Sequence, residues 1–161
     1  HALNMMKVAK EIHDKKLKFS DEACSELKNL KDALIEILEI TVDSFINNDL
    51  EEAKKVEPLE QVIDKLKSNI KKAHVARLKK GICTIETGFV LSDLITNCER
   101  VADHCSNIAV CLIQVADDSF DTHEYLNNVK SHGDEMFDKL YKAYKQKYGI
   151  TKSVKSAEPQ A

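Results

Sequence analysis

Apolar residues recur every three or four positions through almost the whole of this 161-residue chain, in stretches far longer than a β-strand. Between Leu27 and Phe45 they predict the buried seam of one long amphipathic helix. Four glycines and two prolines leave too few turn-forming residues for a sheet-rich fold or a glycine-lined phosphate loop. The chain is therefore predicted to be all-α, an antiparallel helical bundle.

Capping and helix-breaking residues divide this pattern into separate helices. Ser20 and Asp49 are expected to be N-caps. Gly81 is expected to end a helix, and Pro58 to kink or interrupt the helix that contains it. The polar residues 149–161 are expected to form a flexible tail. Five helices follow, over residues 1–16, 20–47, 49–80, 88–116 and 120–148.

Charge, hydropathy and cysteine content indicate which classes of partner and which cellular compartment to expect. The net charge of −3 gives no general attraction to nucleic acid or to anionic lipid. The longest apolar run, Ile108 to Ile113, is six residues, against the roughly 20 that a membrane span needs. The five cysteines form no C-x-x-C pair and indicate a reducing compartment. We therefore expect a cytoplasmic protein with no nucleic-acid partner and no membrane span in this chain.

Two of the predicted helices each carry a pair of carboxylates four residues apart, on one face and about 6 Å apart along the axis. Glu60 and Glu99 have no lysine or arginine three or four residues away, so another group must neutralise them. Packed helices lie about 8 to 10 Å apart, a gap that facing carboxylates and hard or borderline cations would fill. The predicted metal ligands are Glu60, Asp64, Glu99 and Asp103.

Polar residues near these pairs are candidates for outer ligands or for hydrogen bonds to the ligands, with Glu57 and Asn107 ranked first. The alternative is that the acidic pairs are solvated, and that the chain is a metal-free helical adaptor that docks a partner protein through its acidic stripe. The chain has no Glu-x-x-His motif, which argues against a carboxylate-bridged redox enzyme. No nucleophile and base pair stands out, so no catalytic activity is expected.

Residues 99–109 read Glu-Arg-Val-Ala-Asp-His-Cys-Ser-Asn-Ile-Ala and resemble the E-R-x-x-D-H-x-x-N-I-A signature of the PhoU family of phosphate-uptake regulators. Residues 60–64 resemble the companion (E/D)-x-x-x-D motif of that family. Residues 1–5 share an H-x-x-N-apolar pattern with residues 104–108, and residues 1–9 resemble the end of the family's first signature helix. Residues 120–148 resemble the PhoU-type cytoplasmic tail of bacterial sodium/phosphate cotransporter-like proteins.

The resemblance implies a PhoU-like helical domain over residues 1–148. Residues 1–16 would be the tail of an upstream repeat, 20–116 one full three-helix-bundle repeat, and 120–148 an extra C-terminal helix. It also implies that the four carboxylates hold a multinuclear cluster of iron or zinc. The implied function is non-catalytic regulation of phosphate uptake through a membrane phosphate transporter or a phosphate-sensing kinase. The identity of the metal, the partner and the formation of a homodimer stay open.

Overall fold

The computed structural model describes residues 1–116 and 135–150. No strand occurs within these residues, and the prediction of an all-α fold is confirmed. The remaining parts of the chain, which include residues 120–134 of the predicted fifth helix and most of the predicted tail, lie outside the described residues. The helices are α1 (Ala2–Asp14), α2 (Asp21–Asn47), α3 (Leu50–Ala53), α4 (Val56–Lys79), α5 (Ile85–Ala116) and α7 (Glu135–Lys147).

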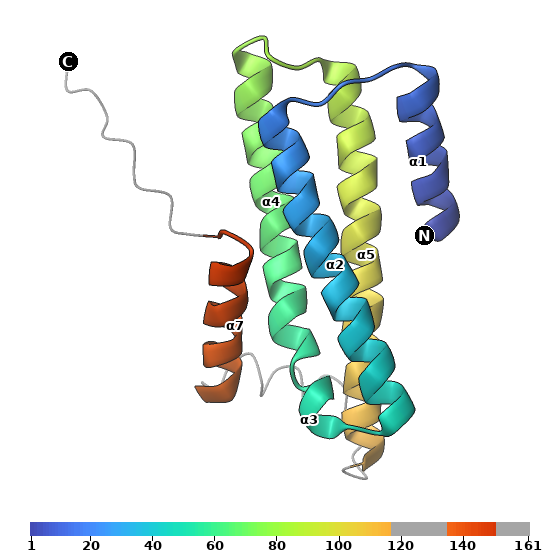
Figure 1. The fold of residues 1–161 in the computed structure, drawn as a ribbon, viewed down its shortest axis with the longest axis vertical. Helices are drawn as coiled ribbons and strands as arrows, with labels where there is room; N and C mark the ends of the chain where they lie inside the picture. Colours follow the sequence, from blue (N-terminus) through green and yellow to red (C-terminus); the bar gives the residue numbers. More distant parts are fainter. Residues whose placement is uncertain (117–134, 151–161) are drawn as a thin grey trace, which may run out of the picture.

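Three long helices, α2, α4 and α5, form the bundle (Figure 1). Helix α4 runs antiparallel to both α2 and α5, and the one-turn helix α3 lies in the connection from α2 to α4. Helix α1 packs against the N-terminal part of α5, and α7 packs against α4. None of the described helices combines the length and the apolar character that a membrane crossing requires.

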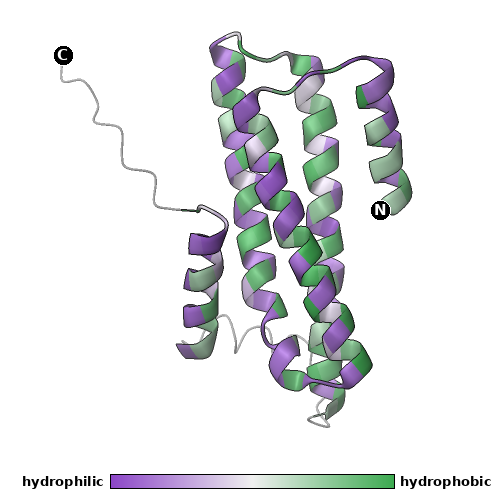
Figure 2. Ribbon diagram, in the orientation of Figure 1, coloured by the Kyte–Doolittle hydropathy of each residue, from purple (hydrophilic) through white to green (hydrophobic). Residues whose placement is uncertain are grey.

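The core lies where α2, α4 and α5 meet, and α5 is apolar along most of its length (Figure 2). Full burial of one aliphatic side chain contributes about 1.5 to 3 kcal/mol of transfer free energy, so this core supplies the main driving force for folding. It also holds α4 and α5 in one register. The large aliphatic side chains that are completely or almost completely buried are Leu30, Ile37, Leu59, Ile63, Ile70, Leu91 and Ile95.

Helix boundaries follow the predicted caps with two corrections, of which the smaller is that α5 begins at Ile85, three residues before the predicted start. The Ser20 hydroxyl accepts a hydrogen bond from the Ala23 amide, and Asp49 accepts from two amides at the start of α3. Gly81 follows α4 with φ of 70°, in the left-handed region that glycine adopts without strain. The helix predicted over residues 49–80 is interrupted, but the prediction that this happens at Pro58 is wrong, because α3 ends at Ala53 and α4 begins at Val56. Pro58 lies in the first turn of α4, where a missing amide hydrogen costs no helical hydrogen bond.

Some apolar residues that the periodicity assigns to the interior are on the surface. The Phe45 side chain is 64% exposed, so the prediction that it lies in the buried seam of α2 is wrong. In α1, Leu3 and Met6 are also exposed, and Val8 is buried. The three exposed residues extend the apolar stripes of α1 and α2 to positions that no other described helix covers.

Candidate functional site

The antiparallel packing of α4 and α5 brings the two predicted acidic motifs opposite each other. At one end of the shared surface, the Ser106 hydroxyl donates a hydrogen bond of 2.5 Å to the Glu57 carboxylate. Between this contact and the centre of α4, Glu60 is within hydrogen-bonding reach of Asp103. The register of the two helices thus sets the Glu60–Asp64 motif against the Glu99–Asp103 motif.

We call the four carboxylates Glu60, Asp64, Glu99 and Asp103 the acidic row. Burial raises the pKa of Asp103, and the negative charges of Glu99 and Asp64 raise it further. The hydrogen bond with Glu60 and the positive charge of Lys67 act in the opposite direction. Since a hydrogen bond between two carboxyl groups requires a proton on one of them, the row favours the uptake of positive charge.

Lys67 supplies the positive charge that the sequence left unassigned. Its Nζ lies 2.5 Å from Oε1 of Glu99, and the two side chains are 16% and 20% exposed. The spacing along a single helix does not reveal this role, because Lys67 neutralises a carboxylate of the neighbouring helix. The available signal was its position seven residues, or two helical turns, after Glu60, which places both residues on the same face of α4.

The chemistry of the acidic row is that of an oxygen-only donor set, which hard and borderline cations prefer. Within the residues that the structure describes, no three histidine, cysteine, aspartate or glutamate side chains are arranged to hold one metal ion. Lys67 also engages Glu99. The oxygen donors are therefore of the type that a cation prefers. To bind one, Glu99 would have to break its ion pair with Lys67, and the carboxylates would have to move closer to a common point.

The two residues ranked as outer ligands have different positions. Glu57 is buried, accepts from Ser106, and also accepts a hydrogen bond of 3.4 Å from the Gln61 amide. Asn107 lines an apolar groove together with Phe45, on a different face of α5 from Ser106. The residue that hydrogen-bonds Glu57 is thus Ser106, which was not predicted, and not its neighbour Asn107, which was.

A polar hollow of about 330 Å³ opens beside the acidic row. Glu60, Asp64 and Lys65 of α4 line it, and Tyr141 of α7 closes its other side. Asp64 is exposed, whereas Glu60 is half-buried. The hollow therefore gives these two carboxylates a route to solvent between α4 and α7.

The two segments that share the H-x-x-N pattern touch at the histidine that begins each of them, and the rest of the first segment lies towards Asn97. Nε2 of His1 is 3.2 Å from Nε2 of His104, and the Asn4 amide donates to the Asn97 side chain at 3.4 Å. His104, the neighbour of Asp103 in sequence, is thus in contact with α1. The pattern marks a contact between α1 and α5 as well as a similarity between them.

Comparison with known proteins gives two matches. The family model described as the PhoU domain matches residues 27–112, a range that includes both acidic motifs. A relative from Thermotoga maritima, the phosphate-specific transport system accessory protein PhoU homolog 1, is 25% identical over 120 residues. The alignment covers 74% of this chain and 50% of the relative, so the chain spans about half the length of that protein. No solved structure shows a significant match.

Proposed function

This chain belongs to the PhoU family, and from that membership we propose that it is a cytoplasmic, metal-binding domain that regulates phosphate uptake. The relative from Thermotoga maritima is described as an accessory protein of a phosphate-specific transport system, which supports the link to transport. The domain acts by binding and carries no catalytic step. The observation that carries the proposal is that Asp103 of α5 lies near enough to Glu60, Asp64 and Glu99 for these carboxylates to act on its pKa.

The proposed ligands are the acidic row, Glu60, Asp64, Glu99 and Asp103, which would hold a multinuclear cluster of iron or zinc. A bound cluster would supply the positive charge that offsets the repulsion within the row. The chain's own contribution is to hold the carboxylates in place, since the core fixes the register of α4 and α5. Lys67 keeps Glu99 neutralised until a cation replaces it.

The proposed partner is a membrane phosphate transporter or a phosphate-sensing kinase. The resemblance of residues 120–148 to the tail of sodium/phosphate cotransporter-like proteins favours a transporter joined to the same polypeptide. Cation binding between α4 and α5 would stiffen the face on which α7 packs, because α7 contacts α4 beside the row. The state of the metal site would thereby reach the C-terminal part of the domain.

A metal titration followed by elemental analysis tests the site. Glu60→Gln with Asp103→Asn removes one carboxylate from each motif and keeps the side-chain shapes. The matched control is Glu39→Gln with Asp43→Asn, an exposed pair on α2 with the same spacing of four residues. We expect the wild-type chain and the control to retain iron or zinc and the site variant to lose it. Equal metal content in all three would refute the assignment of the ligands.

A cellular measurement tests the regulatory role. The same two double variants replace the wild-type gene in the source organism, and uptake of labelled phosphate is followed after a change in external phosphate. We expect the site variant to lose the response and the control to keep it. If both variants respond like the wild type, the acidic row does not regulate uptake. Partner binding that weakens with added salt and is unaffected by chelators would then favour the metal-free adaptor.

A further inference from the structure

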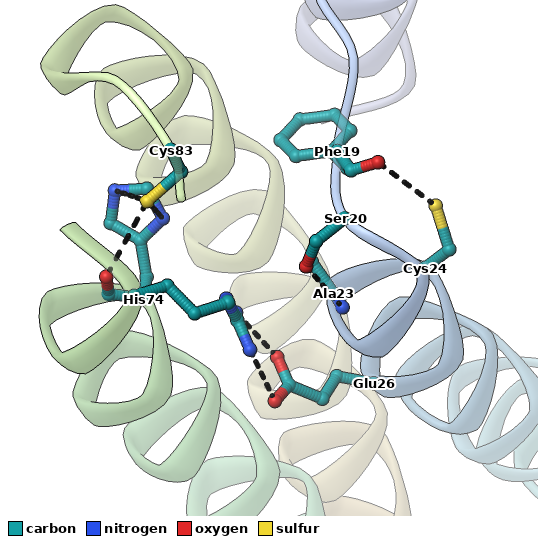
Figure 3. A network of polar contacts seen from close by, with 8 residues as sticks. Phe19, Ser20, Ala23, Cys24, Glu26, His74 and Cys83 are labelled. Carbon is teal, nitrogen blue, oxygen red and sulfur yellow. Dashed lines mark hydrogen bonds and ion pairs between the residues drawn. The ribbon is translucent and has the colours of Figure 1, made fainter. Parts of the chain in front are cut away.

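Cys83 and His74 form a thiol and imidazole pair at the end of the bundle where α4 connects to α5 (Figure 3). The Cys83 sulfur lies 3.5 Å from Nδ1 and 3.9 Å from Nε2 of His74. It also lies 3.7 Å from the His74 carbonyl oxygen, to which it donates. Cys83 is partly exposed in the connection, whereas His74 is 8% exposed on α4. An accessible thiol is therefore in contact with a buried base.

The position of the His74 ring depends on a glycine in the facing helix. A Cβ atom built on Gly88 would lie 2.5 Å from Nε2 of His74 and 3.2 Å from its Cδ2. Any larger residue at position 88 would therefore push the ring away from its present place. Glycine is among the least favourable residues inside a helix, so its presence here is explained by the space that the imidazole occupies.

A clamp one turn further along α4 holds this region against α2. The Arg77 guanidinium donates two hydrogen bonds of 2.8 Å to the two carboxylate oxygens of Glu26. This bidentate geometry fixes the orientation of both side chains. His74 therefore lies on a segment of α4 that is tied to α2 on one side and packed on Gly88 of α5 on the other.

The surroundings of His74 favour the uncharged form of its imidazole. Burial lowers the pKa of His74, and the positive charge of Arg77 lowers it further, whereas Glu26 raises it. Lys71, also on α4, lines a cavity of about 380 Å³ that borders His74 and Gly88. At neutral pH the imidazole is uncharged and able to act as a base.

We propose that Cys83 is a redox modification site whose thiol reacts with hydroperoxides, with His74 as the base. The sulfur attacks one peroxide oxygen, so that an S–O bond forms and the O–O bond breaks. The sulfur is oxidised by two electrons to a sulfenic acid, and the peroxide is reduced to water or an alcohol. The thiol proton passes to the imidazole and then to the departing oxygen.

The other cysteines provide internal comparators. Cys98 and Cys105 are buried, and burial raises the pKa of both thiols, that of Cys98 to about 11. They should not react in the folded chain. Cys24 and Cys111 are more exposed than Cys83. If exposure alone decided reactivity, Cys24 and Cys111 would react first; if the His74 contact decides it, Cys83 does.

The test treats the reduced full chain at pH 7 with limiting hydrogen peroxide and traps sulfenic acid with dimedone. Labelling at each cysteine is followed by peptide mass spectrometry. We expect Cys83 to be labelled at least about tenfold faster than Cys24 or Cys111, since general-base assistance contributes roughly 100-fold or more in enzymes. Labelling of Cys83 at or below the rate of the two exposed cysteines would overturn the proposal.

Two variants separate a base from simple accessibility. His74→Gln removes the base, and Gly88→Ala displaces the ring in a chain that keeps His74; circular dichroism checks that each is folded. Both should lower the Cys83 rate to that of the exposed cysteines, whereas the neighbouring control Ile82→Ala should leave it unchanged. In the wild-type chain, the rate should also fall as the pH drops and His74 becomes protonated, and His74→Gln should lack this step. An unchanged rate in both folded variants would refute the role of His74.

Discussion

Replacement of Lys67 by methionine tests how the acidic row is neutralised. Methionine keeps much of the aliphatic stem of lysine and removes the ammonium group, so Glu99 loses its cation with little loss of packing. Removal of one partner from a fully buried ion pair costs about 3 to 5 kcal/mol, whereas an exposed pair contributes about 0.2 to 1 kcal/mol. The Lys67 and Glu99 side chains are 16% and 20% exposed, which places this pair between the two cases.

We therefore expect Lys67→Met to lower the free energy of unfolding by about 2 kcal/mol. For a domain of this size, that loss corresponds to a decrease in Tm of roughly 4 to 8 °C. Urea denaturation of metal-free protein measures the loss directly, and Glu99→Gln with the double variant completes a thermodynamic cycle that isolates the coupling between the two residues. Lys67→Arg is the control, because it keeps the positive charge.

The same variant links stability to metal binding. Without Lys67, Glu99 is free to ligate, so added zinc should stabilise Lys67→Met more than it stabilises the wild-type chain. If Lys67→Met is as stable as the wild type, Lys67 does not neutralise the row. If zinc stabilises both chains equally, Glu99 is not a ligand that Lys67 withholds.

Three further perturbations test the electrostatics and the core. The pKa of Asp103 is raised, so its negative charge destabilises the folded chain at neutral pH, and this effect disappears as the pH falls towards 3.8. Asp103→Asn should therefore stabilise the metal-free protein by about 0.5 kcal/mol at pH 7 and by less at pH 4. A variant that is less stable than the wild type in urea denaturation would contradict this. Ile63 is completely buried, so Ile63→Ala should lower the free energy of unfolding by about 2 to 5 kcal/mol. Ile35 is 46% exposed, so Ile35→Ala should lower it by less than about 1 kcal/mol. Similar losses for the two variants in thermal unfolding would refute the assigned core. Burial and the charge of Glu36 raise the pKa of Tyr144 to about 12, so stability should fall as the pH rises above 10. Tyr144→Phe should lose less helix between pH 10 and 12 by circular dichroism, and equal losses would show that Tyr144 is not buried where α7 packs on the bundle.

Much of the fold is predictable from local patterns. The start of α2 follows from Ser20, whose hydroxyl caps the helix, and its end follows from the polar residues up to Asp49. A break was predicted at Pro58, whereas the chain breaks between Ala53 and Val56, because Pro58 is compatible with the first turn of a helix. The exposure of Phe45 was also missed, since periodicity identifies the apolar face of a helix and does not say which element covers it.

The sequence predicts which residues of the candidate site share a face of one helix, but not which residues of another helix they contact. The spacing of four residues placed Glu60 with Asp64, and Glu99 with Asp103, on single faces. That the two faces meet depends on the register of α4 and α5, which the buried core sets and the acidic residues do not. The same reason explains Lys67 and Ser106, whose roles arise from partners about 30 to 50 residues away in sequence. The metal stays a prediction.

A crystal structure of zinc- or iron-loaded protein, with anomalous scattering data collected at the metal edge, tests the central claim most directly. The account predicts anomalous peaks between α4 and α5, within ligand distance of Asp103 and its neighbours in the acidic row, and an Nζ of Lys67 that has moved away from Glu99. Loaded crystals in which the contact between Lys67 and Glu99 is intact and no peak lies between the two helices would contradict it.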